Sequence, residues 1–140
     1  MDLPDGTKLR LEPADEYPHP TEEATNYNES VYLNLFDPVQ RMGGWFRVGN
    51  RPNEGHAEVS RCVYLPDGSV GFLYSRPRSS SNDAFAADGL ELAILEPFRR
   101  VRLTYEGKLC VLAEPHQMAD PRRAFESNPM VDCSIDLDCF

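Results

Sequence analysis

Residues 56–75 read HAEVSRCVYLPDGSVGFLYS, two β-prone runs joined by a short polar segment. Pro66 fixes φ near about −65°, which suits the second position of a β-turn, and Gly68 tolerates a positive φ. A turn of this kind between runs of β-branched and aromatic residues is typical of a β-hairpin. We therefore expect His56–Leu65 and Ser69–Ser75 to pair as antiparallel strands.

The same pattern continues on both sides of this hairpin, with short β-prone runs separated by turn residues. Eight runs are predicted: Ser30–Phe36, Gly44–Gly49, His56–Leu65, Ser69–Ser75, Leu90–Glu96, Phe98–Tyr105, Lys108–Ala113 and Val131–Phe140. Glu106 and Gly107 are predicted to form a tight turn between two of them. Asp120 can cap a helix that begins at Pro121, so one short helix is expected near residues 121–126. The spacing predicts an all-β antiparallel sheet, strongly bent or partly closed into a barrel.

Length and composition allow one globular domain. The chain has 140 residues, of which 41% are hydrophobic, and a net charge of −9. Residues 1–29 combine prolines with acidic side chains and predict an extended arm, whereas residues 30–140 form the β domain. The acidic balance argues against nucleic acid as a partner. Without a long apolar run or a leader-like N-terminus, the sequence predicts a soluble, cytoplasmic protein without a membrane span.

The cysteines and the last run indicate packing rather than metal chemistry. No CxxC spacing is present, so we expect four buried thiols and no metal site: Cys62, Cys110, Cys133 and Cys139. In the last run apolar residues alternate with polar ones, and one face is expected to belong to the core. The aspartates of the other face are expected to pair with Arg100 and Arg102 across the sheet.

Polar and aromatic side chains are concentrated between residues 26 and 58. Since alternate residues of a strand face the same side, three runs each contribute a pair: Tyr32 and Asn34, Trp45 and Arg47, His56 and Glu58. Such a face could line a ligand cavity. The alternative is that these residues form the solvated outer side of an antiparallel sheet.

His56 and Glu58 could act as an acid–base pair, because a carboxylate can raise the pKa of an imidazole and fix its tautomer. Side chains two residues apart on a strand project in parallel rather than toward each other. The alternative is therefore an exposed histidine without a catalytic role.

Four segments carry a family resemblance: Asn28–Asp37, Gly43–Gly55, Leu95–Arg102 and Pro121–Pro129. They are similar to the N-terminal half of bacterial lipocalin-like proteins, a group that includes hydroxyneurosporene synthase, also called carotenoid 1,2-hydratase. The resemblance covers about residues 26–140. It implies a lipocalin-like (calycin-like) fold and an isoprenoid or polyketide-like substrate that is hydrated or cyclised without a metal or organic cofactor.

Members of that group usually have two calycin-like halves, whereas this chain ends within its eighth run. The apolar face of that run would then lie at an open edge, which favours aggregation. We therefore expect the chain to be either a fragment of a two-half protein or one subunit whose sheet is completed by a second polypeptide or by a second copy of itself.

The residues and the resemblance together predict a site for an apolar small molecule of the isoprenoid, steroid or aromatic type. This site would catalyse cofactor-independent hydration, cyclisation or other lyase chemistry, with His56 or Glu58 as the acid. The predicted ligand-binding residues are Tyr32, Asn34, Trp45 and Arg47. The alternative function is a non-catalytic binding or structural subunit that supports a partner enzyme.

Overall fold

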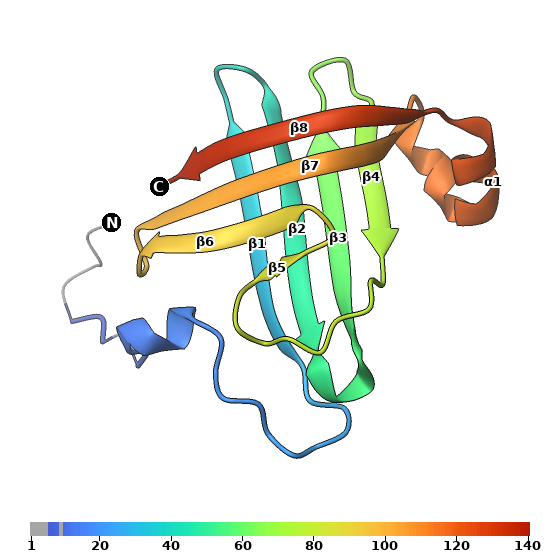
Figure 1. Cartoon of the computed structure of the whole chain (residues 1–140). Coiled ribbons are helices and arrows are strands. Elements are labelled where there is room, and N and C mark those ends of the chain that lie inside the picture. The colour runs from blue at the N-terminus through green and yellow to red at the C-terminus, as the bar shows by residue number, and fades with distance from the viewer. Residues whose placement is uncertain (1–5, 9) are drawn as a thin grey trace.

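The computed structural model describes residues 6–8 and 10–140, so residues 1–5 and 9 of the predicted arm lie outside it. Within the described residues, eight strands form one antiparallel sheet (Figure 1). The strands are β1 (Glu29–Asp37), β2 (Met42–Arg51), β3 (His56–Tyr64), β4 (Val70–Ser75), β5 (Ala86–Ala87), β6 (Leu90–Glu96), β7 (Arg100–Leu112) and β8 (Met130–Cys139). The helical elements are α1 (Pro121–Ser127) and the 3-10 turns η1 (Pro13–Glu16), η2 (Pro52–Glu54) and η3 (Pro115–Ala119). The predicted all-β class with one short α-helix is confirmed.

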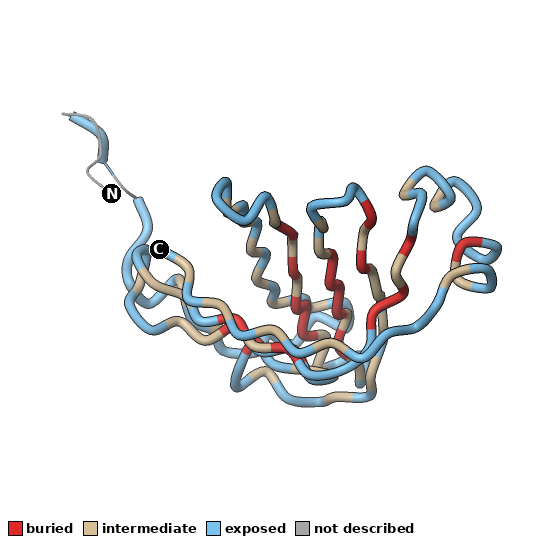
Figure 2. The backbone as a smooth tube through the Cα atoms, turned by 90° about the horizontal axis from the view of Figure 1, so that it is seen from above, coloured by how far each residue is buried: buried red, intermediate tan, exposed pale blue. Residues whose placement is uncertain are grey.

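The sheet bends into two layers because β4 and β6 pair with different parts of one edge of β7. Val70–Phe72 of β4 pair with Cys110–Leu112, whereas β6 pairs with the first half of β7. β6, β7 and β8 consequently cross in front of β1–β4 (Figure 1). Figure 2 shows the β1–β2 and β3–β4 hairpins extending away from β7 and β8. Within the described chain, β1 and β8 have one strand neighbour each, so the sheet is bent but does not close into a barrel.

The core fills the space between the two layers. Its buried apolar residues are Phe46, Val48, Ala57, Val59, Phe85, Leu90, Leu92, Leu103, Tyr105 and Leu109. Each large side chain of this kind contributes about 1.5–3 kcal/mol when it is removed from water. Val31, Leu33 and Leu35 of β1 pack against this core. Residues of the opposite parity on β1–β3 therefore point away from the second layer.

Two predicted local structures are confirmed. The turn after β3 closes with a hydrogen bond from the Gly68 N–H to the Leu65 carbonyl (3.0 Å), and Gly68 has a φ of +88°. Asp120 caps α1, because its carboxylate accepts a hydrogen bond from the backbone N–H of Arg123 (3.2 Å). The helix begins at Pro121, as the sequence predicts.

The predicted turn at Glu106 and Gly107 is wrong. β7 runs without interruption through both residues, and Gly107 pairs with Cys133 of β8. Gly107 is needed for space instead, because a Cβ atom there would collide with the side chain of Tyr105. The Tyr105 hydroxyl lies along the strand and donates to the Lys108 carbonyl (2.7 Å). The glycine thus accommodates a buried tyrosine rather than a change of chain direction.

β8 pairs with β7 along its length, which turns its apolar face toward the core between the layers. Three of its inward residues pack against the core: Cys133, Ile135 and Leu137. On the other face, Arg100 and Arg102 donate to Asp138 and Asp136 in bidentate pairs with N–O distances of 2.5–3.0 Å. The predicted cross-strand pairing is confirmed. The apolar face is therefore covered in part: Cys133, Ile135 and Leu137 are half-buried, Val131 is exposed, and one strand edge of β8 is open among the described residues.

Candidate functional site

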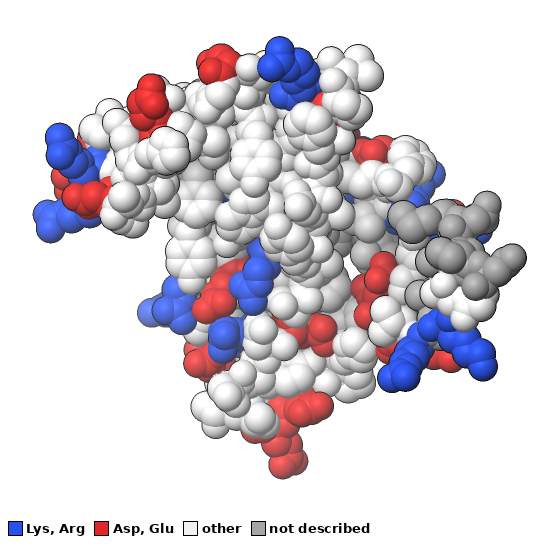
Figure 3. Space-filling model, turned by 180° about the vertical axis from the view of Figure 1, so that it is seen from behind, with Lys and Arg blue, Asp and Glu red and all other residues white. Residues whose placement is uncertain are grey.

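All six predicted site residues lie on one surface, which we call the outer face: the side of β1–β4 that points away from β6–β8. Their parity is opposite to that of the core residues of β1, β2 and β3. Figure 3 shows this face from behind, with a broad uncharged area above a group of charged side chains. The structure therefore brings the predicted residues together, on the outer side of the sheet rather than in its interior.

The uncharged part of the outer face contains an aromatic row, formed by Tyr32, Trp45, Phe72 and Phe125. The ring centroids of Tyr32 and Trp45 are 6.1 Å apart, with an interplanar angle of 28°. Trp45 lies 6.1 Å from Phe72, and Phe72 lies 6.2 Å from Phe125. The row thus crosses from β1 to α1, and Tyr32 is 57% exposed at its end.

Cys62 explains how the rings of Trp45 and Phe72 approach each other. Asn34, Trp45, Cys62 and Phe72 occupy one register row across four strands. Strands two apart are separated by roughly 9.6 Å, so the two rings must lean over the small residue between them. Burial raises the pKa of Cys62 to about 11, which keeps the thiol neutral beneath the rings.

The charged part of the outer face is an arginine cluster, defined by Arg47, Arg51 and Arg76 around the carboxylate of Glu58. Glu58 Oε2 accepts a hydrogen bond from Arg47 Nη1 (3.3 Å). Glu58 Oε1 lies 3.3 Å from Arg51 Nε and 3.8 Å from Arg76 Nη2. Arg51 also pairs with Glu54 at 2.8 Å. Three guanidinium groups therefore meet at one partly buried carboxylate.

Gly49 makes room for this arrangement. It lies opposite Glu58 in the register, and a Cβ atom at this position would lie 2.8–3.0 Å from the guanidinium of Arg47. Without a side chain at residue 49, the Arg47 guanidinium can lie over the backbone of its own strand. Gly49 thereby positions Arg47 toward Glu58.

The charge state of Glu58 follows from this environment. Burial alone would raise the pKa of Glu58, but Arg51, Arg47 and Arg76 together outweigh burial and hold it below its ordinary value. The carboxylate is therefore ionised at neutral pH. An ionised carboxylate accepts protons and pairs with cations, so this geometry does not favour Glu58 as a proton donor.

His56 lies at the edge of the same cluster. Its Nε2 is 2.8 Å from Arg76 Nη2 and 4.0 Å from Glu58 Oε1. A guanidinium can only donate, so the contact with Arg76 is a hydrogen bond when Nε2 carries no proton. His56 and Glu58 thus share Arg76 as a neighbour and do not form a direct hydrogen bond.

Sequence reasoning missed four contributors to this surface: Arg51, Phe72, Arg76 and Phe125. For two of them a signal was present in the β3–β4 hairpin. The register of this hairpin pairs Cys62 with Phe72. When the register is continued one residue beyond the Val59–Ser75 pair, Arg76 lies opposite Glu58. Phe125 comes from α1, and no local pattern connects it to β4.

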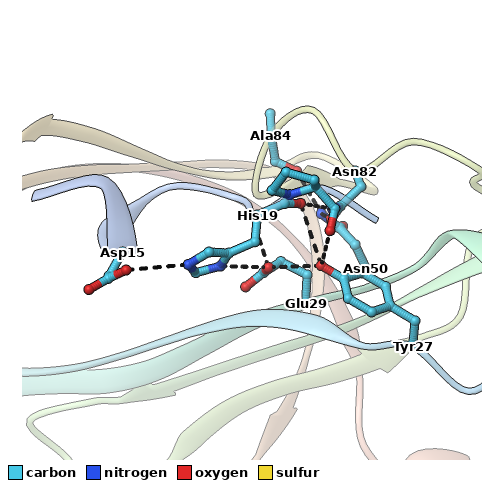
Figure 4. A network of polar contacts seen from close by, with 8 residues as sticks. Asp15, His19, Tyr27, Glu29, Asn50, Asn82 and Ala84 are labelled. Atoms are coloured by element: carbon cyan, nitrogen blue, oxygen red, sulfur yellow. Dashed lines mark hydrogen bonds and ion pairs between the residues drawn. The ribbon is translucent and has the colours of Figure 1, made fainter. Parts of the chain in front are cut away.

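A polar network fastens the arm to the domain (Figure 4). Glu29 Oε2 lies 2.9 Å from His19 Nδ1 and accepts a hydrogen bond from the Tyr27 hydroxyl (3.1 Å). Asn82 Nδ2 donates to the His19 carbonyl (2.7 Å), and buried Asn50 donates to Asn82 (3.2 Å). The arm is therefore attached to the domain through residues of β1, β2 and the loop before β5.

An open groove of about 630 Å³ lies between the layers, at the mouth between β1 and β8. Its lining includes Leu33, Leu35, Phe36, Phe98, Val101, Leu137 and Phe140. Of the six predicted site residues, only Asn34 contributes to this groove. The predicted ligand-binding residues therefore do not converge on the interlayer space.

The described part of the chain carries neither a metal-binding cluster nor a membrane-spanning helix. No group of three or more His, Cys, Asp or Glu side chains there is arranged to hold a metal ion. Residues 6–8 and 10–140 contain no helix that is both long and apolar enough to cross a membrane.

Comparison with known proteins identifies a family but not an activity. No curated protein matches the chain, and no solved structure does. The similarity to the hydroxyneurosporene synthase group remains a prediction from sequence. One family profile matches residues 12–139, which include every strand of the sheet and the whole outer face. The chain therefore belongs to the family described as "Domain of unknown function (DUF7064)".

Proposed function

We propose that this protein binds an apolar small molecule of the isoprenoid, steroid or aromatic type on the outer face of β1–β4. The observation that carries the proposal is the aromatic row, in which Trp45, Phe72 and Phe125 are half-buried and Tyr32 stays exposed, although apolar side chains gain free energy from burial. Tyr32 is 57% exposed, and Tyr74 beside the row is 46% exposed. A ligand that covers these rings would remove their apolar surface from water.

The aromatic row consists of adjacent rings that are inclined to one another by 28–53°. Ring-to-ring contacts of this kind contribute about 0.5–1.5 kcal/mol beyond the area they bury. Trp45 is held by rings on both sides, Tyr32 and Phe72, so little side-chain entropy is lost when a ligand covers it. These features support binding of a molecule with a rigid or planar apolar body.

Binding is better supported than catalysis. Hydration of an alkene requires a proton donor, and the lowered pKa of Glu58 makes this residue a poor one. His56 is then the remaining acid of the predicted pair, and it donates a proton only in the protonated state, in which Nε2 no longer accepts from Arg76. The hydratase or lyase activity that the resemblance implies is therefore the second candidate function, with His56 rather than Glu58 as its acid.

The fluorescence of Trp45 tests the binding proposal, because it is the one tryptophan of the chain. Farnesol, cholesterol and a naphthalene alcohol represent the three ligand classes. We expect saturable changes in Trp45 emission with at least one of them, and about tenfold weaker binding for Tyr32→Ala. Tyr17→Ala is the matched control, since Tyr17 is exposed in the arm.

Three outcomes would contradict the proposal. Trp45 emission could remain unchanged with all three ligand classes, or Tyr17→Ala could weaken binding as much as Tyr32→Ala. Alternatively, Leu137→Arg in the interlayer groove could abolish binding while Tyr32→Ala leaves it unchanged. The last result would move the binding site from the outer face into the groove.

The proposal includes a partner at the open edges of the sheet. β1 and β8 each have one strand neighbour in the described chain, and an edge strand can accept a further strand from another molecule. A second polypeptide or a second copy of the chain would complete the sheet there. Sedimentation of the purified protein tests this part, and a stable 15.8 kDa monomer at micromolar concentration would contradict it.

A further inference from the structure

We infer that the ligand carries a carboxylate group, which binds at the arginine cluster while its apolar body covers the aromatic row. This inference rests on the proposed function and specifies the ligand as an acid. The cluster and the row adjoin on the same strands, since Tyr32 lies directly opposite Arg47 in the register. A single molecule can therefore contact both.

The arginine cluster has an excess of positive charge. Three guanidinium groups face two carboxylates, those of Glu58 and Glu54, which leaves one unbalanced positive charge. The whole chain has a net charge of −9, so this surface differs in sign from the rest of the protein. An anion entering the outer face would be attracted at this position.

The arginines also have hydrogen-bonding capacity left for an anion. A guanidinium has five N–H donors, and Arg47 uses one of them among the described residues, toward Glu58. Arg76 is 55% exposed, and its Nη2 lies 2.8 Å from His56 Nε2. The Nε of Arg51 is buried and faces Glu58 Oε1 at 3.3 Å, so it is not available to an anion. Guanidinium groups match carboxylates in bidentate geometry, which favours a carboxylate as the bound group.

The spacing on β2 limits the size of the ligand. Trp45 and Arg47 are two residues apart and face the same side, so their Cα atoms are separated by roughly 7 Å. A carboxylate at Arg47 would thus be joined directly to the ring or branched chain that covers Trp45. Aromatic acids, isoprenoid acids and steroid acids all have this arrangement.

Calorimetric titration with matched acids and alcohols tests the inference. The pairs are 2-naphthoic acid with 2-naphthalenemethanol, and farnesoic acid with farnesol. We expect each acid to bind at least tenfold more tightly than its alcohol. Arg47→Gln should reduce this preference to about twofold or less, because it weakens binding of the acid more than binding of the alcohol.

Two further variants separate charge from positioning. Gly49→Ala keeps every charge but displaces the Arg47 guanidinium, so it should also weaken the preference for the acid. Arg76→Gln changes an exposed side chain and keeps the test valid if Arg47→Gln fails to fold. Arg102→Gln is the matched control, because it removes one exposed arginine from the other layer.

The outcomes distinguish this inference from the proposed function. Equal affinity for acid and alcohol would overturn the inference and leave the proposed function standing. Absence of binding by all four compounds and by cholesterol would overturn both. If Arg102→Gln reduced the preference for the acid as much as Arg47→Gln, attraction of the acid to any exposed arginine would explain that preference. The inference would then be wrong.

Discussion

Asp88→Asn should destabilise the fold through the buried side chain of Arg61. Arg61 is 0% exposed, and its guanidinium donates to the Asp88 carboxylate at 2.7 Å and to Ser75 Oγ at 2.8 Å. It also lies 4.9 Å from the ring centroid of Tyr105. Asparagine preserves the shape of the side chain and tolerates the positive φ of residue 88, so the substitution removes the charge alone.

The expected cost of Asp88→Asn is about 1–2 kcal/mol. A hydrogen bond to a charged group contributes about 1.5–3 kcal/mol and a neutral one about 0.5–1.5 kcal/mol. Breaking a fully buried ion pair would cost about 3–5 kcal/mol, but the Asp88 side chain is 44% exposed and water screens the interaction. The Asp88 carbonyl and Ser75 also remain as acceptors for Arg61.

Urea unfolding followed by circular dichroism measures this cost, with Asp83→Asn in the loop before β5 as the control. The pH dependence of the free energy of unfolding provides a second measurement. Burial raises the pKa of Asp88, but hydrogen bonds from Ser75 and Arg61 outweigh burial and lower it overall. This stabilisation is present above the pKa of the unfolded state and is lost as pH falls through the folded pKa. The reasoning would be refuted if Asp88→Asn and wild type were equally stable at pH 7. It would also be refuted if both lost stability in the same way as the pH falls.

Three further predictions concern other parts of the fold. Glu29 raises the pKa of His19, so the contact that holds the arm should be strongest below the pKa that His19 has in the unfolded state. It should weaken as pH rises through the pKa of His19 in the folded state. Hydrogen exchange of the arm should show this trend, and His19→Gln should abolish it. Gly107→Ala should cost about 1–3 kcal/mol in urea unfolding, because the added methyl group collides with Tyr105. Arg102→Ala should leave the free energy of unfolding nearly unchanged in the same assay, since its ion pair is exposed, and a marked loss would indicate a role beyond that pair.

The sequence predicts which residues share a strand face but not which face is buried. In β1, the alternation separates Tyr32 and Asn34 from Leu33 and Leu35 without ambiguity. Both sets contain large side chains that could form the wall of a cavity. The structure assigns the leucines to the core because β1–β4 pack against β6–β8, a contact between segments far apart in the chain. Only such long-range packing distinguishes an outer face from an interior.

Glycine in a strand shows the same limit of local reasoning. Glu106 and Gly107 resemble a turn because glycine permits unusual backbone angles. The structure uses Gly107 for the space that the Tyr105 ring requires, while β7 continues through it. The turn at Gly68 was predictable because Pro66 fixes its own φ angle and Gly68 adopts a positive φ angle at little cost. The role of Gly107 depends on how a neighbouring side chain is placed, which local propensity does not encode.

The division of the sheet into two layers has a consequence for how the chain folds. β1–β4 occupy residues 29–75 and β5–β8 occupy residues 86–139, so each layer is built from one continuous segment of chain. Within each layer, consecutive strands mostly pair with their neighbours in sequence, which requires closure of short loops and is fast. The three residue pairs between β4 and β7 join residues about forty positions apart. Docking of two preformed hairpin assemblies is then the slow step, since the entropy cost of this long-range closure precedes the gain from core burial.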